Sequence, residues 1–141
     1  MHQTLEKFGA PKTQLMEFRH WTILLRPAQA TLGSMVLCSK SDELALSALT
    51  GEAVTELKEC ITSIEKALAA TFEPDKLNYL MLMMVDPHVH FHVLPRYSQP
   101  QVFEGVIYED PGWPGPPNLG HKADLPEAGF EKLKQQLASA F

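Results

Sequence analysis

The sequence predicts an α+β fold in which an antiparallel sheet packs against helices. Two strand-like stretches come first, at residues 18–26 and 34–38, and a segment with helical spacing follows at residues 54–68. Two further apolar stretches, 77–85 and 88–94, are separated by only two residues. So short a link favours neighbouring antiparallel strands, because a parallel crossover needs about a dozen residues or more.

The first two strands are predicted from residue type. Phe18 to Arg26 is rich in aromatic and β-branched residues and ends before Pro27, and Ser34 to Cys38 follows a turn at Gly33. We expect these stretches to form an antiparallel pair.

Two helices are predicted. The first follows Thr50, a suitable N-cap, and ends before Pro74, with apolar residues at three- and four-residue intervals: Val54, Leu57, Ile61, Ile64 and Leu68. The second runs from about Pro126 to Ala140, with an apolar face made by Phe130, Leu133 and Leu137.

The stretch from Leu77 to Val85 is apolar on both alternating faces except at Asn78 and Tyr79. This pattern predicts a strand in the middle of the sheet, covered on both sides. Asp86-Pro87 would then connect it to its partner strand, 88–94. Seven of the eleven prolines lie from Pro95 onward, which predicts a loop there.

Composition excludes several classes of function. A formal net charge of −5 argues against binding nucleic acid through a basic surface. The N-terminal residues lack an apolar targeting segment, and no apolar run reaches about 18 residues, so we expect a cytoplasmic protein without a membrane span. Cys38 and Cys60 are far apart in apolar stretches and are predicted to be reduced core residues.

The residues with the clearest chemistry are His88, His90 and His92, which alternate with Val89, Phe91 and Val93. On a strand, the three imidazoles would share one face and the three apolar residues the other, beneath the 54–68 helix. They could be ordinary strand histidines, or two of them could bind a metal ion with a distant third ligand.

A third interpretation is nucleophilic catalysis at phosphorus. A neutral imidazole attacks, a cationic neighbour supports the phosphoryl oxygens, and a covalent intermediate is then hydrolysed. Histidine suits both roles near pH 7, and the reaction requires no metal or other cofactor.

The run from His88 to Leu94, followed by Pro95-Arg96, closely resembles the signature of the histidine triad (HIT) family, including bacterial dinucleoside polyphosphate hydrolases. The resemblance covers about residues 14–97. It implies a HIT-like fold with a five-stranded antiparallel sheet packed with helices, commonly in a homodimer. The whole chain, 1–141, would be a single HIT-like domain, with a proline-rich loop and helix over 98–141.

The resemblance also implies residue roles. His90 would attack the α-phosphorus of a nucleotide, His92 would contact the α-phosphate oxygens, and His88 would orient the other two by hydrogen bonding. The substrate would be a dinucleoside polyphosphate or a nucleoside phosphoramidate, cleaved by hydrolysis or nucleotidyl transfer. The alternative is a nucleotide-binding module with little or no turnover.

The chain departs from the family pattern at two places. Met83-Met84-Val85 stands where many HIT proteins carry Gly-Asn or Gly-Gln-Ser/Thr, and Arg26 lies where an acidic or amide residue often binds ribose. We therefore name Arg26, Asn78 and Arg96 as candidate substrate-binding residues, although Asn78 could instead make a structural hydrogen bond. In the tail, His121 could protonate the leaving group and Trp113 could stack on a base.

Overall fold

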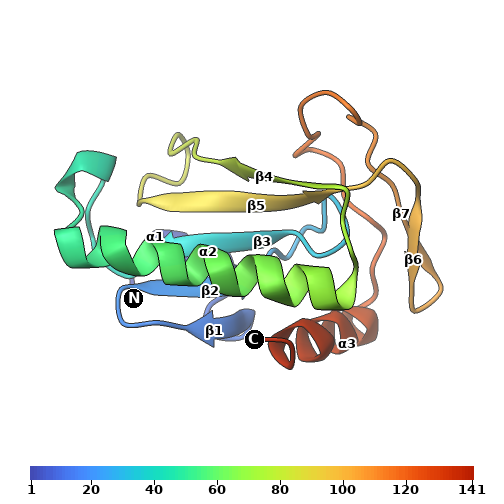
Figure 1. The fold of residues 1–141 in the computed structure, drawn as a ribbon, viewed down its shortest axis with the longest axis horizontal. Coiled ribbons are helices and arrows are strands. Elements are labelled where there is room, and N and C mark those ends of the chain that lie inside the picture. Colours follow the sequence, from blue (N-terminus) through green and yellow to red (C-terminus); the bar gives the residue numbers. More distant parts are fainter.

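A computed structural model describes residues 1–141 and contains a five-stranded sheet in the order β1-β2-β3-β5-β4. Every neighbouring pair in this sheet is antiparallel. The fold is therefore the predicted five-stranded α+β arrangement (Figure 1). Its elements are α1 (Gln3–Lys7), β1 (Gln14–Glu17), β2 (Trp21–Leu25), β3 (Met35–Ser39), a 3₁₀ turn (Leu46–Ala48), α2 (Gly51–Thr71), β4 (Lys76–Leu80), β5 (His90–Arg96), β6 (Gln101–Phe103), β7 (Val106–Tyr108) and α3 (Glu127–Ala138).

Helix α2 covers one face of the sheet and confirms the predicted long helix. The hydroxyl of Thr50 accepts a hydrogen bond from the Ala53 N–H at 3.1 Å, which caps the first turn as the sequence predicted. The buried residues of α2 join those of the central strands and α3 in the main core, which includes Ile23, Leu37, Cys60, Ile64, Leu68, Val89, Val93, Leu133 and Leu137. Val89 and Val93 thus lie on the helix side of the sheet, as predicted.

The N-terminal segment lies over the opposite face. Leu5 and Phe8 form a second, smaller core with Leu24, Val36 and Cys38, which alternate with the main-core residues along β2 and β3. Helix α1 could not be predicted from the sequence, because a helix of five residues is not stable alone and depends on tertiary contacts of this kind.

The predicted strand over 18–26 is wrong at its start. β2 begins at Trp21, and a separate strand, β1, precedes it. Between them the chain turns, and the carboxylate of Glu56 on α2 accepts the N–H groups of Arg19 and His20 at 3.2 and 2.6 Å. A contact from a distant helix therefore stabilises a turn that local residue preferences did not indicate.

The prediction for residues 77–85 is also partly wrong. β4 pairs with β5 as predicted, but it lies at the edge of the sheet and ends at Leu80. Residues 81–89 form a longer connection, in which Met83 has a positive φ of 50° and cannot continue a strand. Met84 and Val85, predicted to be buried, are 83% and 84% exposed.

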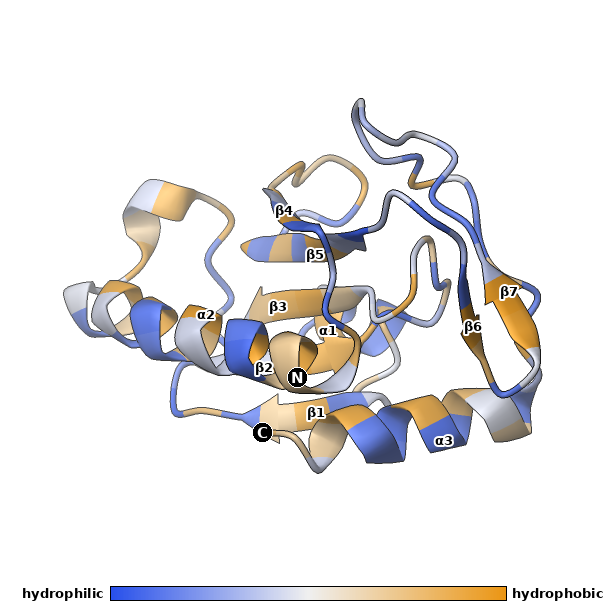
Figure 2. Ribbon diagram, turned by 45° about the vertical axis from the view of Figure 1, so that its right-hand side comes forward, coloured by the Kyte–Doolittle hydropathy of each residue, from blue (hydrophilic) through white to orange (hydrophobic).

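The C-terminal region contains the predicted helix, α3, with Leu133 and Leu137 buried. Figure 2 shows apolar and polar residues alternating around α2 and α3, as expected of helices with one face against a core. The β6–β7 hairpin was not predicted. Its turn residues, Glu104 and Gly105, both have positive φ, which suits a two-residue hairpin turn.

Cys38 and Cys60 are free and buried, which confirms their prediction as reduced core residues. No helix combines the length and apolar character that crossing a membrane would require.

Candidate active site

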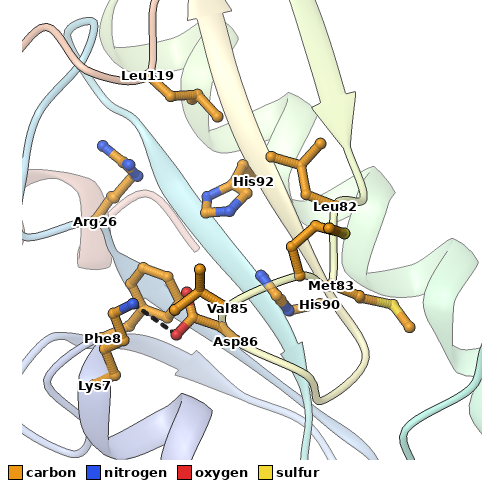
Figure 3. Close-up of a pocket in the computed structure, with 11 residues that line it drawn as sticks. Lys7, Phe8, Arg26, Leu82, Met83, Val85, Asp86, His90, His92 and Leu119 are labelled. Atoms are coloured by element: carbon orange, nitrogen blue, oxygen red, sulfur yellow. Dashed lines mark ion pairs between the residues drawn. The ribbon is translucent and has the colours of Figure 1, made fainter.

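A cavity of about 350 Å³ lies where β5 begins, and it contains two of the three histidines (Figure 3). Four parts of the chain form it together with β5: the end of α1, the residue after β2, the 82–86 segment and the C-terminal loop. The lining residues are Lys7, Phe8, Arg26, Leu82, Met83, Met84, Val85, Asp86, His90, His92 and Leu119.

His90 is the first residue of β5, and its side chain is almost fully buried at 1% exposure. Its Nδ1 lies 2.6 Å from the main-chain carbonyl oxygen of His88. A carbonyl oxygen can only accept, so Nδ1 carries the proton and Nε2 keeps its lone pair. The nucleophilic nitrogen of a neutral His90 is therefore the one that is left for a substrate.

His92 lies two residues further along β5, with its ring 5.1 Å from that of His90 and nearly perpendicular to it. Burial, and then the positive charge of Arg26, lowers the pKa of His92 to about 4. His92 is consequently neutral near pH 7 in the free protein. The expectation of a cationic neighbour beside the nucleophile is wrong for this state.

His88 precedes β5 and does not line the cavity. Its ring stacks on His2, with centroids 3.8 Å apart and planes 3° from parallel, and its Nδ1 lies 2.8 Å from the Thr4 hydroxyl. Burial and the neighbouring His2 lower the pKa of His88. His88 thus lies outside β5 and outside the cavity, and it contacts His90 through its main-chain carbonyl.

Arg26 lines the cavity, as a substrate-binding role would require. Its Nη1 donates to the Ala28 carbonyl at 2.6 Å, whereas its buried Nε has no partner. The other cation of the cavity, Lys7, is paired with Asp86 at 2.7 Å. The guanidinium of Arg26 is therefore the lining cation that no carboxylate neutralises.

Arg96 and Asn78, both predicted to bind substrate, do not line this cavity. The guanidinium of Arg96 donates to both carboxylate oxygens of Asp110 at 2.7 and 3.0 Å and to Asn78 Oδ1 at 2.7 Å. The Arg96 side chain is only 4% exposed. Both residues therefore take part in a buried structural network that joins the end of β5 to the C-terminal loop.

Comparison with known families gives one decisive match: the model of the HIT domain matches residues 8–99. The chain belongs to the HIT family. No curated protein matches the sequence.

Solved structures support the same fold. A HIT protein from Sinorhizobium meliloti superposes with a TM-score of 0.77 at 19% identity, covering 100% of this chain and 96% of that one. A histidine triad protein from Marinobacter aquaeolei gives 0.75 at 22% identity, with 97% and 91% covered. A hypothetical histidine triad nucleotide-binding protein from Sulfolobus tokodaii gives 0.67 at 15% identity, with 91% and 82% covered.

Within this HIT domain, the departure noted at Met83-Met84-Val85 forms one wall of the cavity. The wall is apolar and continues with Leu82 and Leu119, and its side chains supply no hydrogen-bond donor to phosphate. His121 and Trp113 do not line the cavity.

Several lining residues were not predicted, chiefly Lys7, Phe8, Asp86 and Leu119. No motif marks Lys7 and Phe8, because only the folding of α1 across the sheet brings them to His90. The ring of Phe8 lies 5.8 Å from that of His90 and 5.6 Å from that of His92. No group of three or more His, Cys, Asp and Glu side chains has a geometry that could hold a metal ion.

Proposed function

We propose that this HIT protein is a nucleotide hydrolase or nucleotidyl transferase that cleaves at the α-phosphate of a nucleoside phosphate derivative through a nucleotidyl-His90 intermediate. The observation that carries the proposal is the 2.6 Å contact between His90 Nδ1 and the His88 carbonyl oxygen. It fixes the tautomer in which Nε2 can attack phosphorus.

The first step forms a bond between His90 Nε2 and the α-phosphorus, using the Nε2 lone pair. The bond from phosphorus to the leaving group breaks, and the leaving group departs with that electron pair; a departing amine takes up a proton from solvent. His90 then carries a positive charge, which the His88 carbonyl stabilises by accepting the Nδ1 hydrogen bond. In the second step, a water oxygen bonds to phosphorus and the water loses a proton to solvent. The bond between phosphorus and His90 Nε2 breaks, and its electron pair returns to Nε2, so that nucleoside monophosphate and neutral His90 are released.

Arg26 and His92 are the groups best suited to the phosphoryl oxygens. The guanidinium of Arg26 lies at the cavity and has donors in the planar arrangement that fits phosphate. A phosphate bound beside His92 would raise the pKa of this histidine, because a nearby negative charge favours its cationic form. His92 could then become cationic in the complex, although it is neutral in the free protein.

The lining favours a substrate with one anionic phosphate and a partly apolar leaving group. Arg26 is the cation left without a carboxylate partner, and the opposite wall is formed by Leu82, Met83, Met84 and Val85. A dinucleoside polyphosphate brings several further negative charges that this wall cannot pair. Of the two expected substrate classes, we therefore favour nucleoside phosphoramidates. That a similar fold is described as nucleotide-binding supports the nucleoside part.

The homodimer implied by the family resemblance also remains a proposal. β4 has a neighbour on only one side, so its other edge is free to pair with a second copy. Size-exclusion chromatography with light scattering would distinguish a dimer from a monomer.

The function is tested by measuring nucleoside monophosphate release, in the presence of a chelator, from dinucleoside polyphosphates and from phosphoramidates of an apolar amine. We expect release by the wild type, faster from the phosphoramidates, and none by His90→Asn. Nucleotide binding without release from any substrate would instead support a nucleotide-binding module with little or no turnover. This is the competing interpretation because Met83-Met84 stands where many HIT proteins carry polar residues.

A further inference from the structure

The residue that orients the nucleophile, His88, lies outside the strand that carries the nucleophile. β5 begins at His90, so the sheet pairing of β5 does not include His88. Its carbonyl must nevertheless stay at hydrogen-bonding distance from His90 Nδ1. The next residue, Val89, is held by its buried side chain and by its carbonyl oxygen, which accepts the Ser39 N–H at 2.9 Å. The side chain of His88 itself is held by the N-terminal segment.

His2 forms the first of these contacts. Its Nε2 donates to the Ser39 carbonyl at 2.7 Å, and its Nδ1 accepts the Leu5 N–H at 3.3 Å. Both nitrogens are thereby engaged, one with the end of β3 and the other with the first turn of α1. The ring of His2, held in this way, stacks face to face on His88 at 3.8 Å.

Thr4 forms the second contact. It is 1% exposed, and its hydroxyl lies 2.8 Å from His88 Nδ1. The stack restricts the plane of the His88 ring, and the hydrogen bond restricts its rotation within that plane. A side chain fixed on two sides leaves its own main-chain carbonyl little freedom.

We propose that His2 and Thr4 are positioning residues, which hold the His88 carbonyl against His90 Nδ1 and so maintain the nucleophilic tautomer. The proposal rests on the function proposed above for His90. Both residues precede position 8, where the match to the HIT domain begins, so the family pattern itself does not account for them. They act through His88 and do not line the cavity.

The test uses Thr4→Val, which removes the hydroxyl and keeps the shape of the side chain, and Thr4→Ser, which keeps the hydroxyl. Thr22→Val is the matched control, because Thr22 is also buried and hydrogen-bonded on the sheet but no hydrogen bond connects it to a histidine. Two quantities are measured: kcat and KM for phosphoramidate hydrolysis, and the tautomer of His90 from its ring nitrogen chemical shifts.

We expect Thr4→Val to lower kcat by about 10- to 100-fold, the usual effect of losing a hydrogen bond that orients a reactive histidine, with little change in KM. The fraction of His90 protonated at Nδ1 should fall as well. Thr4→Ser should restore both quantities, and Thr22→Val should change neither. His2→Ala, which removes the stack, should act in the same direction as Thr4→Val.

An unchanged His90 tautomer in both Thr4→Val and His2→Ala would overturn the proposal, as would an equal loss of kcat in Thr22→Val. The tautomer measurement needs no substrate. If the wild type proves inactive, the proposed function fails while the positioning of His90 is still tested by the chemical shifts.

Discussion

The network around Arg96 gives a quantitative prediction about stability. Asp110→Ala removes a carboxylate that is 1% exposed and that accepts two hydrogen bonds from Arg96, at 2.7 and 3.0 Å. The same carboxylate accepts the Tyr97 N–H at 3.3 Å. The buried guanidinium would keep only Asn78 as a partner.

Breaking a buried ion pair by removing one partner costs about 3–5 kcal/mol, because the remaining charge is left uncompensated. The total stability of a domain is about 5–15 kcal/mol, so Asp110→Ala should lose a large part of it. Urea denaturation followed by circular dichroism measures this loss. Glu104→Ala is the control: it breaks the exposed pair with Lys132 and should change stability by less than about 1 kcal/mol.

A loss below about 1 kcal/mol in Asp110→Ala would refute the reasoning, because the network would then not compensate a buried charge.

Asn78→Ala provides a second check. It should destabilise the fold by about 1–3 kcal/mol, the cost of leaving a buried donor unpaired, without changing KM. A raised KM with unchanged stability would show instead that Asn78 contacts the nucleotide.

Three further predictions concern the site and its supports. Arg26→Met should raise KM about 10-fold or more through loss of a charged hydrogen bond to phosphate, and an unchanged KM would exclude this contact. The pKa of His92 is lowered from 6.5 to about 4, so between these pH values the imidazole binds a proton in the unfolded chain but not in the folded one. The stability of the fold should therefore be full above about pH 6.5 and fall toward pH 4. In His92→Asn the fall should be smaller. Gly33→Ala should destabilise the fold by about 1–2 kcal/mol, because Gly33 has φ +85° and an added Cβ would lie 3.1 Å from Leu68; thermal unfolding at the wild-type midpoint would contradict this.

The sequence predicted those parts of the fold whose signals are local. The capping threonine of helix α2 acts as predicted, and Ile64 and Leu68 of the predicted apolar stripe are buried, whereas Val54 is 52% exposed. The antiparallel pairing of β4 with β5 was also predicted, although the link between them spans residues 81–89 and is longer than the two residues expected. The end of β4 was not predicted, because the continuous apolar run from Leu80 to Val85 does not show where the strand ends and the cavity wall begins.

The candidate site was predicted only in part. His90, His92 and Arg26 line one cavity. Arg96 instead donates a hydrogen bond to Asp110, a residue of the C-terminal loop 14 positions later. His88 does not line the cavity, and its ring contacts His2 and Thr4 of the N-terminal segment. Such partners depend on tertiary packing, and a short helix with a histidine cap carries no sequence signal from which they could be inferred.

The signal for the β6–β7 hairpin was present in the sequence. Glu104-Gly105 is flanked on both sides by β-branched and aromatic residues, a pattern typical of a two-residue hairpin turn. The abundance of proline after Pro95 obscured it.

The most direct test of the central claim is to detect the covalent intermediate. The protein is mixed with a nucleoside phosphoramidate, quenched within milliseconds to seconds, and analysed by intact mass and peptide mapping. We expect the added mass of one nucleoside monophosphate, located on His90, absent from His90→Asn, and decaying as free monophosphate accumulates. Product formation by the wild type with no adduct at His90, or turnover by His90→Asn at the wild-type rate, would contradict the account.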